Sequence, residues 1–200
     1  MNMKLCIFDM GGVIIRNFHI APKLLPFLGL ETKTLQEYDP RLGASLALHS
    51  EGKITEDEFW NYYREITNKK IPQQQGSLLG RFFTPTLDRP TVTLVEKLKK
   101  KNFRVVCGTN VIDAHFKIHQ QLHQYDIFDK VYPSHILGIA KPKLEFFHAI
   151  CEAEQVNPEE AFFTDDMQAN VDASIQAGLK GYLYVDAETL ECQLKEFKLL

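Results

Sequence analysis

The sequence has few cysteines and no two of them close together. The 200 residues include four, Cys6, Cys107, Cys151 and Cys192, and none belongs to a Cys-x-x-Cys pair. Such pairs supply zinc ligands or redox-active dithiols, so their absence argues against both kinds of site. Two of the four fall in expected buried strands, where a free thiol behaves as a small apolar side chain. We therefore expect reduced thiols and a cytoplasmic protein.

The sequence also lacks long apolar runs and an excess of either charge. The apolar run near the N-terminus is too short for a signal peptide, and the charged Asp9 follows it at once. No later apolar run would span a bilayer. The 23 basic and 26 acidic residues are mixed along the chain and give a formal net charge of -3. A nucleic-acid-binding protein would carry a clustered basic excess. We expect neither a membrane nor a nucleic acid as a partner.

What is present is an alternation of short apolar runs with amphipathic segments. With 44% hydrophobic residues, the chain is long enough to bury one sizeable core. Expected strands are residues 4–8, 103–107, 131–132, 161–164 and 181–185. Expected helices are residues 92–101, 113–124, 143–153 and 169–177. Repeated β-α-β units predict an α/β protein with a parallel sheet and helices on both of its faces.

Residues 16–85 interrupt this alternation and read as helical and turn-rich. Thr55 and Glu58 have the spacing of a capping box at the start of a helix that carries Trp60, Tyr62 and Tyr63. Such aromatic residues could line a pocket, but core packing is the favoured interpretation. Residues 73–77 are an expected loop. We therefore predict a core formed by residues 1–15 and 86–200, and a small inserted helical domain at residues 16–85.

The first expected strand ends in Asp9-Met10-Gly11-Gly12. In open parallel sheets, ligands bind beyond the carboxyl ends of the strands, which is where Asp9 falls. Two glycines allow a sharp turn and let backbone N–H groups approach an anion. Taken alone, the stretch is explained equally well by an Asp that caps a turn.

Three later stretches also contain polar or charged side chains that could bind a phosphate or a cation. Thr109 and Asn110 follow the second strand and could donate hydrogen bonds to phosphate oxygens, although such a pair more often caps a helix or turn. Lys141, next to a proline, offers a point charge, although most lysines are solvated. Asp165 and Asp166 end a buried strand without a basic partner nearby in sequence. Such a pair is costly unless a cation balances it, and oxygen ligands favour Mg²⁺.

In this order, the four stretches resemble the four motifs of the haloacid dehalogenase (HAD) superfamily. The resemblance covers nearly the whole chain, and the helical insertion is similar to the small cap of a subfamily rich in sugar-phosphate phosphatases. It implies a Rossmann-like, three-layer α/β/α core with a helical cap. The implied activity is Mg²⁺-dependent hydrolysis of a small phosphorylated metabolite through an aspartyl-phosphate intermediate.

The resemblance also implies a role for individual residues. The nucleophile would be Asp9, with Lys141 neutralising charge between it and the phosphate. The implied catalytic residues are Asp9, Thr109 and Lys141. The implied substrate-binding residues are Met10, Gly11, Thr109, Asn110 and Lys141. The implied Mg²⁺ ligands are Asp9, the Gly11 carbonyl and Asp166, with Asp165 in support and the choice between the last two left open.

Gly11 departs from the pattern of the superfamily's phosphatases. These usually carry there a second Asp, which acts as general acid and base. General acid–base catalysis contributes about 10²–10⁴-fold, so its loss predicts a slow or selective enzyme rather than an inactive one. Such an enzyme would borrow an acid from the cap or favour a good leaving group, such as that of a sugar 1-phosphate. Two alternatives stay open: a 2-haloacid dehalogenase, which needs neither the second Asp nor a metal, and a non-catalytic binding protein.

Several histidines and one arginine could take part in a site. His115, His119 and His123 share one helix face and could bind a transition metal, but a solvated or partly packed face is the favoured interpretation. Arg16 and His19 follow the Asp9 loop and, by position alone, are candidates to reach the substrate.

Overall fold

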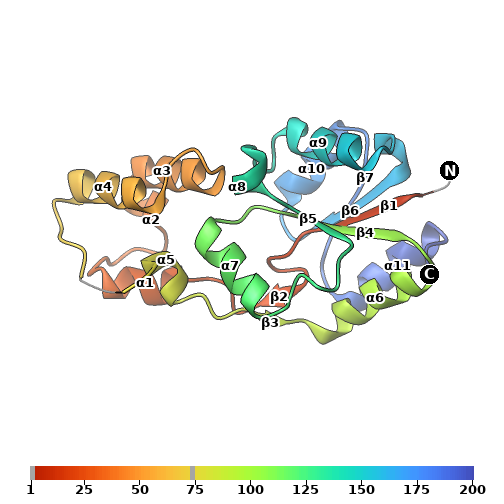
Figure 1. Ribbon diagram of the computed structural model, residues 1–200, viewed down its shortest axis with the longest axis horizontal. Coiled ribbons are helices and arrows are strands. Elements are labelled where there is room, and N and C mark those ends of the chain that lie inside the picture. Colours follow the sequence, from red (N-terminus) through yellow and green to blue (C-terminus); the bar gives the residue numbers. More distant parts are fainter. Residues whose placement is uncertain (1–2, 73–74) are drawn as a thin grey trace.

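The computed structural model describes residues 3–72 and 75–200. Its centre is a five-stranded sheet in the order β5-β4-β1-β6-β7, with every neighbouring pair parallel (Figure 1). The strands are β1 (Leu5–Phe8), β4 (Arg104–Thr109), β5 (Lys130–Pro133), β6 (Ala161–Asp165) and β7 (Lys180–Leu183). The sequence prediction of a parallel α/β sheet is confirmed.

Helices cover both faces of this sheet. One face is covered by α6 (Arg89–Lys100) and α11 (Ala187–Glu196), and the other by α9 (Leu144–Glu154) and α10 (Gln168–Gln176). Successive side chains of β1 point to opposite faces, as in any strand. Cys6 and Phe8 accordingly join one apolar cluster, whereas Leu5 and Ile7 join the other. The central strand is therefore buried on both sides, which explains its continuous apolar run.

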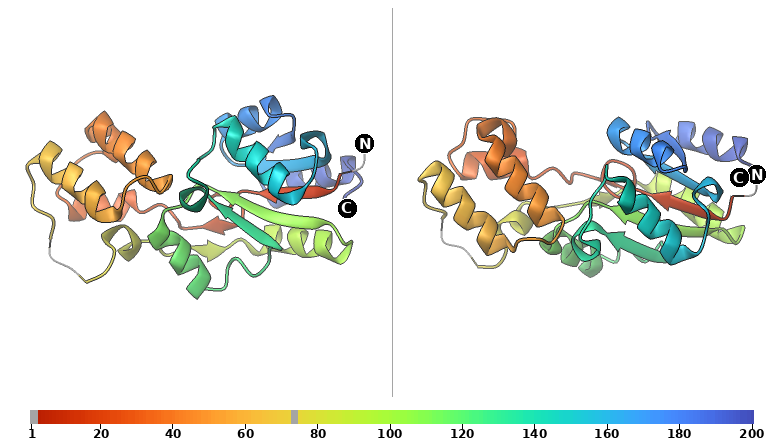
Figure 2. Two further views of the ribbon diagram at one scale, coloured as in Figure 1. Left: turned by 45° about the horizontal axis from the view of Figure 1, so that its top comes forward. Right: turned by 90° about the horizontal axis from the view of Figure 1, so that it is seen from above.

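The helical insertion begins and ends at a two-stranded antiparallel ribbon. This ribbon pairs β2 (Ile15–Arg16) with β3 (Thr86–Leu87). Between the two strands lie α1 (Ala21–Phe27), α2 (Leu35–Tyr38), α3 (Pro40–Ser50), α4 (Glu56–Thr67) and α5 (Leu78–Arg81). These helices form one end of the molecule, beyond the carboxyl ends of the sheet strands (Figure 2). The expected loop at residues 73–77 includes Gln73 and Gln74, which lie outside the described residues.

The insertion has an apolar cluster of its own. Phe59, Trp60 and Tyr63 are buried in it, which confirms the core prediction for Trp60 and Tyr63. The prediction is wrong for Tyr62, which lies on the outer face of α4 and is 44% exposed. The helix begins with the predicted capping box between Thr55 and Glu58. Ile112, from the segment before α7 (Asp113–Gln121), packs into the same cluster, so the insertion contacts the sheet domain.

No helix within residues 3–72 and 75–200 is both long and apolar enough to cross a bilayer.

Candidate active site

The candidate catalytic residues at the ends of three sheet strands lie together at the carboxyl edge of the sheet. Asp9 directly follows β1, while Thr109 and Asp165 are the last residues of β4 and β6, the two strands that flank β1. Lys141 comes from the segment between α8 (Ser134–Leu137) and α9, next to the cis peptide bond that it forms with Pro142. Parallel pairing thus brings residues more than 150 positions apart in sequence to one place.

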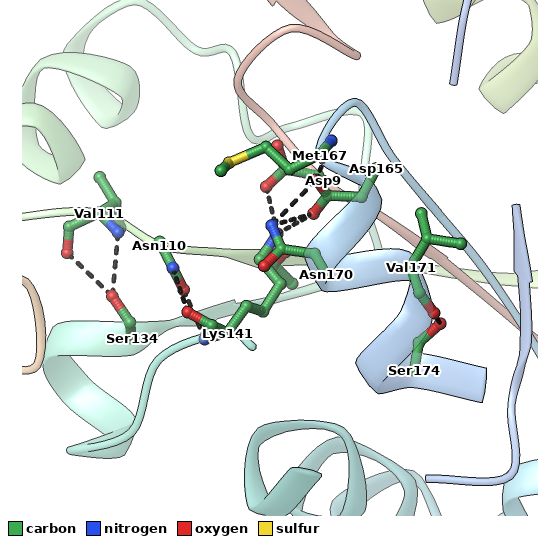
Figure 3. Close-up of polar contacts among 11 residues, drawn as sticks. Asp9, Asn110, Val111, Ser134, Lys141, Asp165, Met167, Asn170, Val171 and Ser174 are labelled. Carbon is green, nitrogen blue, oxygen red and sulfur yellow. Dashed lines mark hydrogen bonds and ion pairs between the residues drawn. The ribbon is translucent and has the colours of Figure 1, made fainter. Parts of the chain in front are cut away.

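Lys141 lies at the centre of the cluster (Figure 3). Its Nζ is 2.6 Å from Asp9 Oδ1 and 2.6 Å from Asp165 Oδ2, and it donates to the Gly108 carbonyl at 2.9 Å. The Lys141 side chain is only 1% exposed. Asp165 thus has no basic partner nearby in sequence, as expected, but Lys141 of a distant loop supplies one in the fold. A buried lysine is tolerated because charged and polar groups surround its ammonium.

The environment changes the pKa of both members of the central ion pair. Burial raises the pKa of Asp9 to about 7; Lys141 opposes this effect and Asp165 adds to it. Burial alone would lower the pKa of Lys141, but the two neighbouring carboxylates outweigh it and the net direction is upward. Lys141 therefore remains a cation at neutral pH, held against the carboxylate at the end of β1.

The two carboxylates that end β6 have different environments. Asp165 is fully buried, and its Oδ1 accepts hydrogen bonds from the Met167 N–H at 2.8 Å and Asn170 Nδ2 at 3.0 Å. Its Oδ2 accepts from Asn170 and Lys141. Asp166 is exposed to solvent, and partial desolvation and the neighbouring Asp165 raise its pKa. Asp166 is thus the freer carboxylate of the pair.

The carboxylates of Asp9, Asp165 and Asp166 form a site that suits a hard cation. One oxygen from each lies within 4.8 Å of the others. Three carboxylates face one ammonium, so excess negative charge remains. A divalent cation with oxygen ligands, such as Mg²⁺, matches this donor set.

Gly12 allows the loop after β1 to pass close to Asp166. Its φ is +73°, and a Cβ there would lie 2.0 Å from Asp166 Oδ2. A side chain would therefore be strained by the backbone and would displace the carboxylate. Arg16 stabilises the same loop by donating to the carbonyls of Gly12, Val13 and Ile15. Its guanidinium thus faces this loop and Tyr184, and does not line the cavity described below.

Gly11 has a different neighbour, the ring of Phe18. A Cβ at position 11 would lie 3.2 Å from Phe18 Cε2. A side chain at position 11 would therefore be in tight contact with the Phe18 ring, which would have to shift by a few tenths of an ångström. Nothing in the sequence pattern predicts this contact, because it depends on how the chain folds back after β2.

Asn110 and Thr109 differ in what they bind within the chain. The Asn110 side chain forms two hydrogen bonds with the backbone of Lys141: Oδ1 accepts from its N–H and Nδ2 donates to its carbonyl, both at 2.9 Å. The Thr109 hydroxyl, which is buried at the end of β4, has no hydrogen-bond partner among the described residues. Asn110 thus holds Lys141, while Thr109 is free to bind a ligand.

A cavity of about 330 Å³ adjoins these residues. Gly11, Thr109 and Asn110 line it from the sheet domain, whereas Leu46 of α3 and Leu79 of α5 line it from the helical insertion. Arg16 and His19 were both candidates to reach a substrate because they follow the Asp9 loop. Of these two, His19 lines the cavity and Arg16 does not. The cavity is therefore a partly open cleft between the two parts of the chain.

The three histidines of the α7 region do not form a metal site. His115 Nε2 donates to the Leu79 carbonyl at 3.0 Å, and its ring stacks on Phe83 with centroids 3.8 Å apart. His119 Nδ1 lies 2.6 Å from Gln124 Oε1, and His123 pairs with Asp126 at the surface. Within the described residues, only the three aspartates meet the geometry of a metal site. Burial lowers the pKa of His115 to about 4, so it is neutral at neutral pH.

The chain is similar to known phosphatases over nearly its whole length. It is 25% identical to a sesquiterpene phosphatase of Aspergillus oryzae, with 96% of this chain and 95% of the relative covered. It is 24% identical to a D-ribitol-5-phosphate phosphatase of Bacteroides thetaiotaomicron, with 90% and 91% covered.

The chain is also similar to a solved structure of a HAD-family enzyme. A mutant HAD-family enzyme of Bacteroides thetaiotaomicron, in complex with magnesium and inorganic phosphate, superposes with a TM-score of 0.72 at 25% identity, covering 92% of this chain and 95% of that one. The family model of haloacid dehalogenase-like hydrolases matches residues 3–178. This chain therefore belongs to the haloacid dehalogenase-like hydrolase family.

Proposed function

We propose that the protein is a Mg²⁺-dependent phosphatase that hydrolyses a small phosphate monoester through an aspartyl-phosphate at Asp9. The observation that carries the proposal is the cluster at the sheet edge, in which Lys141 Nζ contacts Asp9 Oδ1 at 2.6 Å beside two further carboxylates. Relatives along the whole chain include phosphatases, and a similar structure contains magnesium and phosphate, which supports the same chemistry here.

In this proposal, Asp9, Asp166 and the Gly11 carbonyl hold the cation. Asp165 supports the site from behind, because both of its oxygens already accept hydrogen bonds from Met167, Asn170 and Lys141. When bound, Mg²⁺ supplies charge neutralisation and orientation of the phosphate.

The remaining groups bind and orient the phosphoryl group. The Thr109 hydroxyl, the Lys141 ammonium and the N–H groups of Met10 and Gly11 contact its oxygens, and Asn110 acts as a positioning residue by holding the Lys141 backbone. Fixed donors of this kind stabilise the charge that develops in phosphoryl transfer.

The reaction has two balanced steps. An Asp9 carboxylate oxygen forms a bond to phosphorus as the ester P–O bond breaks, and the departing oxygen keeps the electron pair and takes a proton from solvent. Water then attacks the same phosphorus and loses a proton. The P–O bond to Asp9 breaks, which releases inorganic phosphate and restores the carboxylate.

Gly11 leaves the first step without its usual acid. We propose residues 16–85 as the cap that covers the site, and His19 from its first segment lines the cavity. The lost general acid would reduce the rate by about 10²–10⁴-fold. The same feature, with Phe18 over position 11, is the observation that favours a non-catalytic binding protein as the second candidate.

Phosphate release from p-nitrophenyl phosphate tests the proposal. We expect Mg²⁺-dependent release by the native chain and none by Asp9→Asn, which keeps the shape but removes the nucleophilic carboxylate. Asp172→Asn, an exposed position on α10, is the matched control and should remain active. Release that is unaffected by Asp9→Asn would contradict the proposal. Absence of release from any ester would favour the binding protein, and halide release from a 2-haloacid without metal would favour a dehalogenase.

A further inference from the structure

The cavity beside Thr109 has mainly apolar walls. Phe18, Ile20 and Ala21 line it from the segment after β2 and the start of α1, and Leu46 and Leu79 line it from α3 and α5. Among the described residues that line it, none is Asp, Glu, Lys or Arg. A sugar-binding site needs several polar groups to pair with hydroxyls, and these walls are instead made largely of hydrocarbon.

Most polar side chains of the cavity already have a partner within the protein. The Asn110 amide bonds to the Lys141 backbone, and His115 Nε2 donates to the Leu79 carbonyl. His119 Nδ1 contacts Gln124 Oε1, and the Ser50 hydroxyl donates to the Ala47 carbonyl. These groups therefore have reduced capacity to recognise the hydroxyls of a substrate.

The two sides of the cavity differ, because the helical insertion contributes mainly apolar side chains, with His19 and Ser50 as its polar residues among those that line the cavity. Gly11, Thr109 and Asn110 belong to the carboxyl edge of the sheet, where the aspartate cluster lies, whereas Leu46 and Leu79 belong to the opposite, helical wall. A ligand that spans the cavity would therefore have a charged phosphate at one end and an apolar group at the other.

We infer that the natural substrate is the phosphate ester of an apolar alcohol, not a sugar or polyol phosphate. The inference rests on the proposed phosphatase function and adds the chemical class of its substrate. A hydroxyl moved from water to an unpaired position is strongly disfavoured, whereas each buried hydrocarbon group favours binding in proportion to its area. The cavity volume of about 330 Å³ lies at the small end of the range for ligand sites, which fits one short chain or ring.

Two esters of primary alcohols, octyl phosphate and ribitol 5-phosphate, test the inference with matched leaving groups. We expect kcat/KM to be at least about tenfold higher for octyl phosphate, a difference within the range that hydrophobic pockets supply. Equal values, or a preference for ribitol 5-phosphate, would overturn the inference while leaving the phosphatase function intact.

Variants within one helix provide a control for the cavity. Leu46→Gln introduces a polar group into the α3 wall and should lower kcat/KM for octyl phosphate about tenfold or more, and should lower it less for acetyl phosphate, which has no alkyl chain to contact this wall. Leu48→Gln, on the same helix but 39% exposed, should leave both substrates unaffected. Ala21→Leu should shift the preferred alkyl chain to a shorter one. Identical chain-length profiles in all variants would contradict the assignment of this cavity.

A binding measurement tests this inference independently of the proposed phosphatase activity. If no ester is hydrolysed, phosphatase activity fails, but the cavity can still be tested with phosphonates that cannot be cleaved. By calorimetry, octylphosphonate should bind at least about tenfold more tightly than methylphosphonate, with the negative heat-capacity change of apolar burial. Equal affinities would overturn the inference whatever the catalytic result.

Discussion

Position 11 gives the chain its main chemical peculiarity. The Phe18 ring lies next to this position, so an acidic side chain there would fit better if the ring were smaller. We predict that Gly11→Asp alone gives little gain, whereas Gly11→Asp combined with Phe18→Leu raises kcat for alkyl phosphates. The gain should approach the contribution of a general acid, about 10²–10⁴-fold.

The rate of octyl phosphate hydrolysis in the single and double variants is the measurement. Phe18→Leu alone is the control and should not accelerate the reaction. A full gain in Gly11→Asp without the second change would show that Phe18 does not restrict this position.

Some features of single residues could be predicted from the sequence and others could not. Asp9, Thr109, Lys141 and the Asp165-Asp166 pair were all selected from local patterns, and the structure brings them together. Asn110 was also selected, but its amide binds the Lys141 backbone, a contact between residues 31 positions apart. Such a contact is decided by the approach of two loops, about which neither local sequence carries information.

At the scale of elements, α5 and α7 connect the helical insertion to the sheet domain through a half-buried histidine. His115 of α7 donates to the Leu79 carbonyl of α5 and stacks on Phe83. Burial is the main cause that lowers its pKa to about 4; nearby His119 and His49 add to this, while Leu79 and Glu56 oppose it. At neutral pH this contact is therefore made by a neutral ring, because burial disfavours the imidazolium form.

This lowered pKa predicts a loss of stability in acid. An unfolded histidine has a pKa of about 6.5, so between about pH 6.5 and pH 4 the unfolded state binds more protons than the folded state. The contribution of His115 is thus complete above about pH 6.5 and falls as the pH is lowered towards 4, by at most about 3 kcal/mol.

Urea unfolding near neutral pH and at about pH 5 measures this effect. His115→Gln removes the titration and keeps a donor, so the free energy of unfolding should depend less on pH than in the native chain. His123→Gln, at the surface beside Asp126, is the control and should leave the pH dependence unchanged. An unchanged dependence in His115→Gln would contradict the account.

The elements themselves were predictable where they are long and periodic. The five sheet strands and α6, α7, α9 and α10 were expected within a few residues of their observed bounds, because buried strands and amphipathic helices have distinct apolar patterns. The C-terminal helix α11 was missed, although Asp186 caps it and Leu190 and Leu194 are buried one turn apart. The two-residue strands β2 and β3 are too short for any period, and only their pairing defines them.

At the scale of the whole molecule, polar contacts join the sheet domain to the helical insertion. Ser134, at the start of α8, donates to the Ser50 carbonyl at the end of α3 at 2.5 Å and accepts from the Val111 N–H at 2.9 Å. Lys143 and Glu51 form an ion pair across the same boundary. These contacts fix α3, which carries Leu46 of the cavity wall, against the sheet domain. In the proposed function, the substrate chain and its phosphate would then be bound by different parts of the protein.

The most direct test of this account is to trap the covalent intermediate. The native chain, mixed with Mg²⁺ and octyl phosphate carrying radiolabelled phosphorus and quenched in acid within one turnover, should retain label. Peptide mapping should place that label on Asp9, and Asp9→Asn should retain none. Label on another residue, or phosphate release without any labelled enzyme, would contradict the proposal that Asp9 is the nucleophile.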